Sequence, residues 1–111
     1  MEINEINNFI DSEIKRLEEY YSLKGKGQEE IILAMALKIG EEVGELFNEV
    51  LAHKGFQRKD KLSKLNKKEI ESEIADVIFT TFILSRKFNI NIDDAINEKM
   101  AKIKKRIYDK E

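Results

Sequence analysis

The segment IADVIFTTFILS, from Ile74 to Ser85, is apolar on almost every side of the helix that it would form. The chain contains no proline and only five glycines, so few residues are available to interrupt helices or to make tight turns. A helix tolerates apolar side chains all round only if more than one of its faces is covered. The segment therefore predicts a central, covered helix and favours helices throughout the chain.

Before this segment, apolar residues recur at the three- and four-residue steps of amphipathic helices. The spacing predicts a first helix over residues 3–23, which the glycine-containing stretch 24–27 ends. It predicts a second helix over residues 28–53, which Gly55 stops, and a basic loop after it.

Helix-start signals mark the other two helices. Asn66 followed three residues later by Glu69 is close to a capping box, which places the start of the central helix near residue 67. Asn91 opens a fourth helix, because two aspartates follow it in the first turn and apolar residues then recur along one side.

Four helices in 111 residues predict a single all-α domain over residues 1–111, a four-helix bundle-like unit. A chain of this length buries only about two-thirds of its unfolded surface, so its core is thin. Because the central helix needs covering on several sides, we expect oligomerisation to complete the bundle, as a homodimer or homotetramer.

The composition excludes several classes of function. Charged residues make up 38% of the chain, but the net charge of -2 is too small for a polycation, so no nucleic-acid polymer is expected as a partner. The absence of cysteine excludes disulfides, thiolate metal sites and nucleophilic-cysteine chemistry. No signal-peptide run and no eighteen-residue apolar run occur, so we expect a cytoplasmic protein with no membrane partner.

Two pairs of carboxylates lie on the predicted helices at three-residue spacing, which places each pair on one helix surface. Glu42 and Glu45 form the first pair, and Glu73 and Asp76 the second. Asp76 lies within the most apolar segment, where an unpartnered carboxylate would cost several kcal/mol. Four carboxylates converging from adjacent helices suit a hard divalent cation, so the pattern predicts a Mg²⁺ site, with Mn²⁺ as the alternative ion.

The competing interpretation is that these acids are solvated surface charges that pair with lysines such as Lys38. For Glu41 or Glu49 alone this interpretation is favoured. It is disfavoured for the four together, because Asp76 lies inside an apolar run and Gly44 leaves room beside the glutamates.

The pattern Glu-Glu-x-x-Glu at 41–45, followed by Glu-x-x-Asp at 73–76, resembles the signature of the MazG-like all-α nucleoside triphosphate pyrophosphohydrolases. The neighbouring residues 37–40 and 77–78 are also similar to the family, and the resemblance covers about 31–108. It implies Mg²⁺-dependent hydrolysis of nucleoside triphosphates, including dNTPs or non-standard NTPs, to a nucleoside monophosphate and pyrophosphate. It also implies that water attacks the α-phosphate.

The resemblance further implies roles for individual residues. The Mg²⁺ ligands would be four carboxylates: Glu42, Glu45, Glu73 and Asp76. Lys38, one turn before Glu42, would lie close to phosphate, and Glu41 would act behind the ligands or as the general base.

The last predicted helix is basic from Lys99 to Arg106. These two residues are seven apart and therefore share a helical side. The resemblance implies that both contact phosphate, whereas the other lysines of the segment complement the helix dipole. Many relatives carry an asparagine four residues after the lysine, and this chain has Ile103 there, which puts one substrate hydrogen bond in doubt.

Two other functions remain open at this point. Phosphoribosyl-ATP pyrophosphohydrolase of histidine biosynthesis belongs to a related all-α family with a similar Lys-Ile-Gly-Glu-Glu segment, although a basic last helix reaching Arg106 and Tyr108 looks more like the MazG type. The second is a non-enzymatic helical interaction protein, in which the acids are surface charges and the central helix is a dimer seam.

Overall fold

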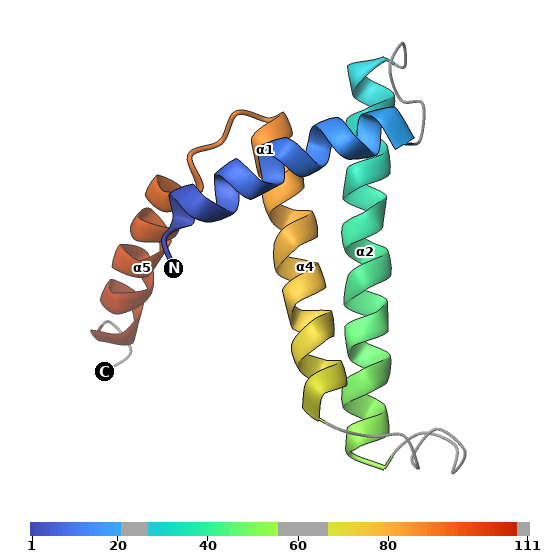
Figure 1. Ribbon diagram of the computed structural model, residues 1–111. Coiled ribbons are helices and arrows are strands. Elements are labelled where there is room, and N and C mark those ends of the chain that lie inside the picture. The colour runs from blue at the N-terminus through green and yellow to red at the C-terminus, as the bar shows by residue number, and fades with distance from the viewer. Residues whose placement is uncertain (21–26, 56–66, 109–111) are drawn as a thin grey trace.

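The computed structural model describes residues 1–20, 27–55 and 67–108. These residues form four α-helices and no strand, which confirms the predicted all-α class (Figure 1). The helices are α1 (Ile3–Tyr20), α2 (Gln28–His53), α4 (Lys67–Lys87) and α5 (Ile92–Tyr108). The predicted end of the first helix at residue 23, the capping role of Asn66 and most of the basic loop lie outside the described residues.

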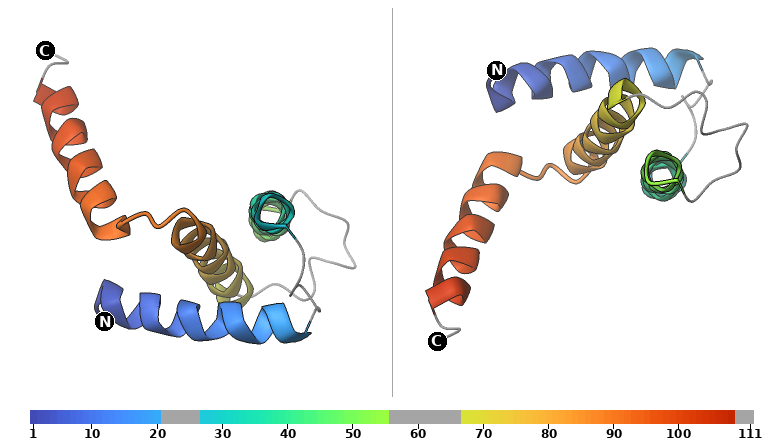
Figure 2. Two further views of the ribbon diagram at one scale, coloured as in Figure 1. Left: turned by 90° about the horizontal axis from the view of Figure 1, so that it is seen from above. Right: turned by 90° about the horizontal axis from the view of Figure 1, so that it is seen from below.

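Helices α2 and α4 lie side by side and antiparallel, and α1 crosses α4 on another side (Figures 1 and 2). Among the described residues, few apolar side chains are buried: Ile10, Ile31, Ala52 and Phe82. The core is therefore thin, as the length of the chain predicts.

α1 is held across the C-terminal half of α4 by apolar and charged contacts. Ile10 is only 1% exposed, and the rings of Phe9 and Phe79 lie with their centroids 5.6 Å apart. The guanidinium of Arg86 donates two hydrogen bonds to the carboxylate of Asp11, at 2.9 and 2.8 Å. A bidentate pair has a defined geometry. The Asp11–Arg86 pair therefore sets the register of α1 on α4 in addition to attracting the two helices.

Hydroxyl groups within α4 are satisfied by the backbone of their own helix. Thr80 donates to the carbonyl oxygen of Asp76 at 2.9 Å, and Ser85 donates to that of Phe82 at 2.7 Å. These bonds remove the desolvation cost of placing hydroxyls in apolar surroundings. α4 can therefore pack against α1 and α2 although its central segment contains polar residues.

The turn between α4 and α5 depends on Asn89, which has a φ of 55°. Asparagine tolerates this left-handed conformation better than most residues, and it ends α4. The amide of Ile90 donates to the carbonyl of Ser85 at 3.0 Å, and the amide of Asp94 donates to the side-chain oxygen of Asn91 at 3.1 Å. This second bond confirms that Asn91 opens the last helix.

α5 leaves this turn away from α4 and stands apart from α2 in every view (Figures 1 and 2). The radius of gyration is 17.5 Å, whereas a compact domain of this length would have about 13 Å. None of the described helices is long and apolar enough to cross a membrane. Large apolar side chains stay exposed on α2, α4 and α5. Apolar faces of these helices are therefore left uncovered by the residues that the structure describes.

Candidate metal centre

The antiparallel packing of α2 and α4 brings the middle of α2 opposite the first half of α4. Glu42 of α2 thereby meets Glu73 and Asp76 of α4, and one carboxylate oxygen from each lies within 4.8 Å of the other two. Three of the four predicted ligands thus come together. Such a group of oxygen donors matches the ligands that hard divalent cations prefer.

The burial of these carboxylates fits a bound cation. Glu42 is 7% exposed, and one of its oxygens, Oε2, is buried without a hydrogen-bond partner among the described residues. Oε2 of Glu73 is also buried without a hydrogen-bond partner among the described residues. An unpartnered buried carboxylate oxygen is costly, and a cation between the two helices would satisfy both.

Burial raises the pKa of Glu73 above its ordinary value, and the charges of Glu45, Asp76, Glu42 and Glu49 raise it further. Both causes disfavour the ionised form. The negative charge of the metal-free centre therefore destabilises the folded state.

This shift predicts a pH dependence for the metal-free protein. The pKa of Glu73 is 4.5 in the unfolded chain and higher in the folded protein, so the folded state binds the proton more tightly. The stability of the folded state therefore falls as the pH rises from about 4.5 through the raised pKa. Thermal melts in EDTA across this range should show the fall in the wild type and a smaller one in Glu73→Gln. Parallel pH profiles for the two proteins would contradict the shift.

Lys38 lies beside the carboxylates on α2. Its Nζ is 3.3 Å from Glu42 Oε1 and 3.4 Å from Glu41 Oε2, and its side chain is 51% exposed. The pairing with Glu42, more than that with Glu41, raises the pKa of Lys38. Lys38 therefore stays protonated at the edge of the centre, where an anion from solvent can reach it.

The structure does not bring the remaining predicted residues into the carboxylate group. Glu45 is exposed and acts on Glu73 through its charge, and Glu41 is also exposed. Lys99 and Arg106 are exposed on α5, which lies apart from α2 and α4 (Figure 1). Within one chain, the predicted phosphate-binding residues of α5 are thus separated from the predicted metal ligands.

Two features of the site escaped the sequence analysis. Glu49 was expected to be a surface charge, but it is half-buried and contributes to the charge around Glu73. Its position one turn after Glu45 was the available signal. Gly44, expected to leave room beside the glutamates, lies on the exposed side of α2, and a Cβ there would meet nothing within 4 Å.

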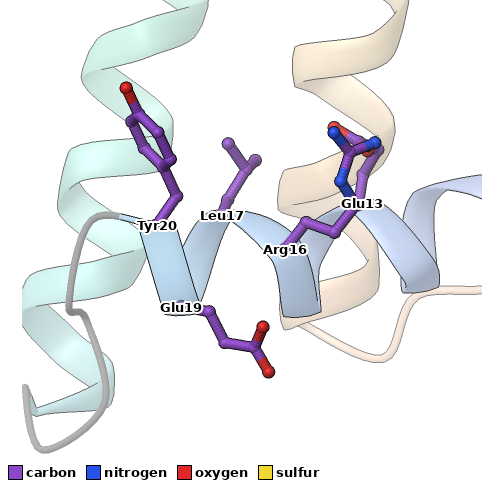
Figure 3. A pocket seen from close by; sticks show the side chains of 5 residues that line it. All are labelled: Glu13, Arg16, Leu17, Glu19 and Tyr20. Atoms are coloured by element: carbon purple, nitrogen blue, oxygen red, sulfur yellow. The ribbon is translucent and has the colours of Figure 1, made fainter.

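A hollow of about 520 Å³ adjoins the carboxylates, and its lining is mostly apolar. Lys38 lines it one turn before Glu42, and Thr80 lines it one turn after Asp76. Figure 3 shows Leu17 projecting from α1 toward the space between α2 and α4. The other lining residues are Ile31, Ala34, Met35 and Ile83.

A second hollow, of about 430 Å³, lies along α1 and is drawn in Figure 3. Its lining comes from α1 alone, and the Arg16 guanidinium in it pairs with Glu13. None of the clustered carboxylates lines either hollow, but Lys38, which pairs with Glu42, lines the larger one. The larger, apolar hollow is therefore the one that lies nearer to the candidate metal centre.

Comparison with known proteins identifies the family. The family model of the MazG nucleotide pyrophosphohydrolase domain matches residues 31–109, which is well over half of the chain. The chain is 35% identical over 78 residues to the uncharacterized protein YpjD of Bacillus subtilis (strain 168), covering 70% of this chain and 68% of YpjD. No solved structure matches the chain significantly. The chain therefore belongs to the MazG nucleotide pyrophosphohydrolase family.

Proposed function

We propose that this protein hydrolyses nucleoside triphosphates to a nucleoside monophosphate and pyrophosphate with Mg²⁺ held between α2 and α4. The observation that carries the proposal is the pair of buried, unpartnered oxygens of Glu42 and Glu73, close to Asp76. These three residues would hold the ion, and Glu45 would join them from the exposed edge. When bound, Mg²⁺ would neutralise phosphate charge and lower the pKa of the attacking water.

The chain's own residues would bind and orient the substrate. Lys38, which stays protonated because of its carboxylate neighbours, would contact the phosphates at the edge of the centre. Glu41, which is exposed and pairs with Lys38, would accept a proton at a carboxylate oxygen or orient Lys38.

The apolar hollow supports a nucleotide as the substrate. Lys38 and Thr80 each lie one helical turn from a clustered carboxylate, and Lys38 pairs with Glu42, so the hollow lies close to the metal centre. A ligand with its phosphates at the carboxylates would place its base and sugar among apolar side chains, which is the usual lining of a small-molecule site.

The test is pyrophosphate release from a panel of ribonucleoside and deoxyribonucleoside triphosphates, with phosphoribosyl-ATP included. We expect turnover of nucleoside triphosphates with Mg²⁺ or Mn²⁺ and none in EDTA, because the carboxylates alone repel a polyphosphate. Turnover of phosphoribosyl-ATP alone would assign the related histidine-biosynthesis activity. No release from any substrate would reject the proposal.

We also propose that the protein is a homodimer or homotetramer. On α2, Leu33, Leu37 and Phe47 are 62%, 75% and 64% exposed, and with Gly40 and Gly44 they form one stripe at alternating four- and three-residue steps. Apolar stripes of this kind bury themselves against another helix, and glycines allow a close approach.

Light scattering at micromolar concentration should give at least twice the chain mass of 13.0 kDa. Leu37→Lys should shift the protein toward the monomer, because it places a charge in the stripe without touching the core. Lys54→Ala, at an exposed position beyond α2, should leave the mass unchanged. A monomeric wild type would refute the oligomer.

A further inference from the structure

Among the described residues, Lys38 is the cation that pairs with a carboxylate of the candidate metal centre. Its Nζ lies 3.3 Å from Oε1 of Glu42 and 3.4 Å from Oε2 of Glu41. The three clustered carboxylates, with oxygens within 4.8 Å of one another, repel each other, and one positive charge at their edge offsets part of this repulsion. Lys38 therefore acts as a counter-ion of the metal-free centre.

The contacts of Lys38 are loose in comparison with another lysine pair of the same chain. Lys87 of α4 lies 2.7 Å from Glu18 of α1, which is the length of a charge-assisted hydrogen bond, and its side chain is 13% exposed. Both contacts of Lys38 are longer, and its side chain is 51% exposed. Exposed pairs three or four residues apart on a helix contribute little to stability. Lys38 can therefore leave Glu42 at little cost.

Lys38 also reaches a second environment. Besides pairing with the carboxylates, it lines the apolar hollow of about 520 Å³. A lysine amine sits on a flexible four-carbon stem, so it can exchange one anionic partner for another while the backbone of α2 stays in place. The phosphates of a nucleotide whose base lies in the hollow would be such a partner.

A divalent cation is a stronger partner for Glu42 than Lys38 is. Mg²⁺ carries twice the charge of an ammonium group and binds carboxylate oxygens at about 2.0–2.1 Å, whereas the Lys38 amine stays at 3.3 Å. A bound cation neutralises the carboxylates that attract Lys38, and its own charge repels the amine. Cation binding therefore favours release of Lys38 from Glu42.

We propose that Lys38 is an exchangeable counter-ion, which pairs with Glu42 and Glu41 until a divalent cation binds and then transfers its amine to the phosphates of the substrate. The exchange couples the two binding events, because the cation releases the amine that a polyphosphate needs and the polyphosphate removes the charge that opposes the cation. The transfer to phosphate rests on the proposed function, whereas the competition between Lys38 and the cation does not depend on turnover.

The affinity for Mg²⁺ tests the competition without activity. Lys38→Met removes the charge and keeps a long, unbranched side chain, so calorimetric titration of the nucleotide-free protein at low salt should give a Kd for Mg²⁺ about 3- to 10-fold lower than in the wild type. Lys38→Arg keeps the charge and should bind Mg²⁺ as the wild type does. The gain in Lys38→Met should shrink at high salt, because salt screens the repulsion, whereas a change in packing would not respond to salt.

Lys68→Met is the matched control for the loss of one positive charge. Lys68 lies 3.8 Å from Glu71 on an exposed surface of α4, and neither residue belongs to the clustered carboxylates. This variant should therefore leave the Kd for Mg²⁺ unchanged. Weaker Mg²⁺ binding by Lys38→Met would mean that Lys38 positions Glu42 for the cation and would overturn the proposal, as would an affinity equal to that of the wild type.

Steady-state kinetics at saturating Mg²⁺ tests the transfer to phosphate. Lys38→Met should raise the KM for a nucleoside triphosphate about 10-fold with a smaller change in kcat, because the lost contact holds phosphate before and during the reaction. Lys38→Arg should restore most of the loss, and Lys68→Met should change neither constant. A wild-type KM in Lys38→Met would overturn the exchange. Tighter Mg²⁺ binding by Lys38→Met in a protein that hydrolyses no nucleotide would reject the proposed function and retain the counter-ion role.

Discussion

Asp76→Asn is expected to reduce pyrophosphate release at least about 100-fold while leaving the helical fold intact. The change preserves the shape of the side chain but removes one of three negative charges whose oxygens lie within 4.8 Å of one another. A cation held by Glu42 and Glu73 alone would be bound more weakly. Because Asp76 is only half-buried and its backbone carbonyl still accepts the Thr80 hydroxyl, α4 should form as before.

The same variant should be at least as stable as the wild type in the absence of Mg²⁺. Deleting a charge beside Glu73 relieves the repulsion that raises the pKa of that carboxyl. Circular dichroism and thermal melts in EDTA would check the fold, and pyrophosphate release would check the activity. Glu30→Gln, the same loss of charge at an exposed position of α2, is the control and should retain wild-type turnover. A folded Asp76→Asn protein with wild-type turnover would falsify the metal-site assignment.

Ile10→Ala should cause a large loss of stability, of about 2–5 kcal/mol. Ile10 is 1% exposed and joins α1 to α4, and few other apolar side chains of the described helices are buried. Its truncation leaves a cavity that the neighbouring side chains fill only in part, and the thin core has little else to compensate. For a chain of this size we expect the melting temperature to fall by about 10 °C or more.

Chemical denaturation of the metal-free protein measures this loss directly. Ile10→Val should cost about 0.5–1.5 kcal/mol, because it removes a single methylene group. Ile90→Ala, at a position 43% exposed, should cost clearly less than Ile10→Ala. Equal denaturant midpoints for Ile10→Ala and Ile90→Ala would contradict this prediction. The packing of α1 on α4 would then contribute less to stability than the burial of Ile10 indicates.

The sequence by itself determined where the helices lie. The second helix was predicted over residues 28–53 and is observed as Gln28–His53, and the central helix begins at Lys67 as its start signal indicates. Helix bounds are predictable because the hydrogen bonds of a helix join residues four apart and its caps are a few residues away. The pairing of Glu73 with Asp76 follows from the same local spacing.

The tertiary structure decided which of these residues meet. Spacing alone grouped Glu45 with Glu42, but the packing of α2 against α4 buries Glu42 and leaves Glu45 at the edge. The same packing brought Glu49 near Glu73 and formed the apolar hollow. Which side of a helix becomes buried depends on contacts between distant segments, and those are not set by local periodicity.

The placement of α5 depended most on tertiary structure. Its sequence predicts a helix with an apolar stripe and a basic edge, and both are observed, but it does not say what the stripe contacts. The left-handed residue Asn89 directs α5 away from α4, so Lys99 and the carboxylates of the same chain remain apart. The direction that a chain takes after a helix depends on a few backbone dihedral angles at the turn, and only the folded structure defines them.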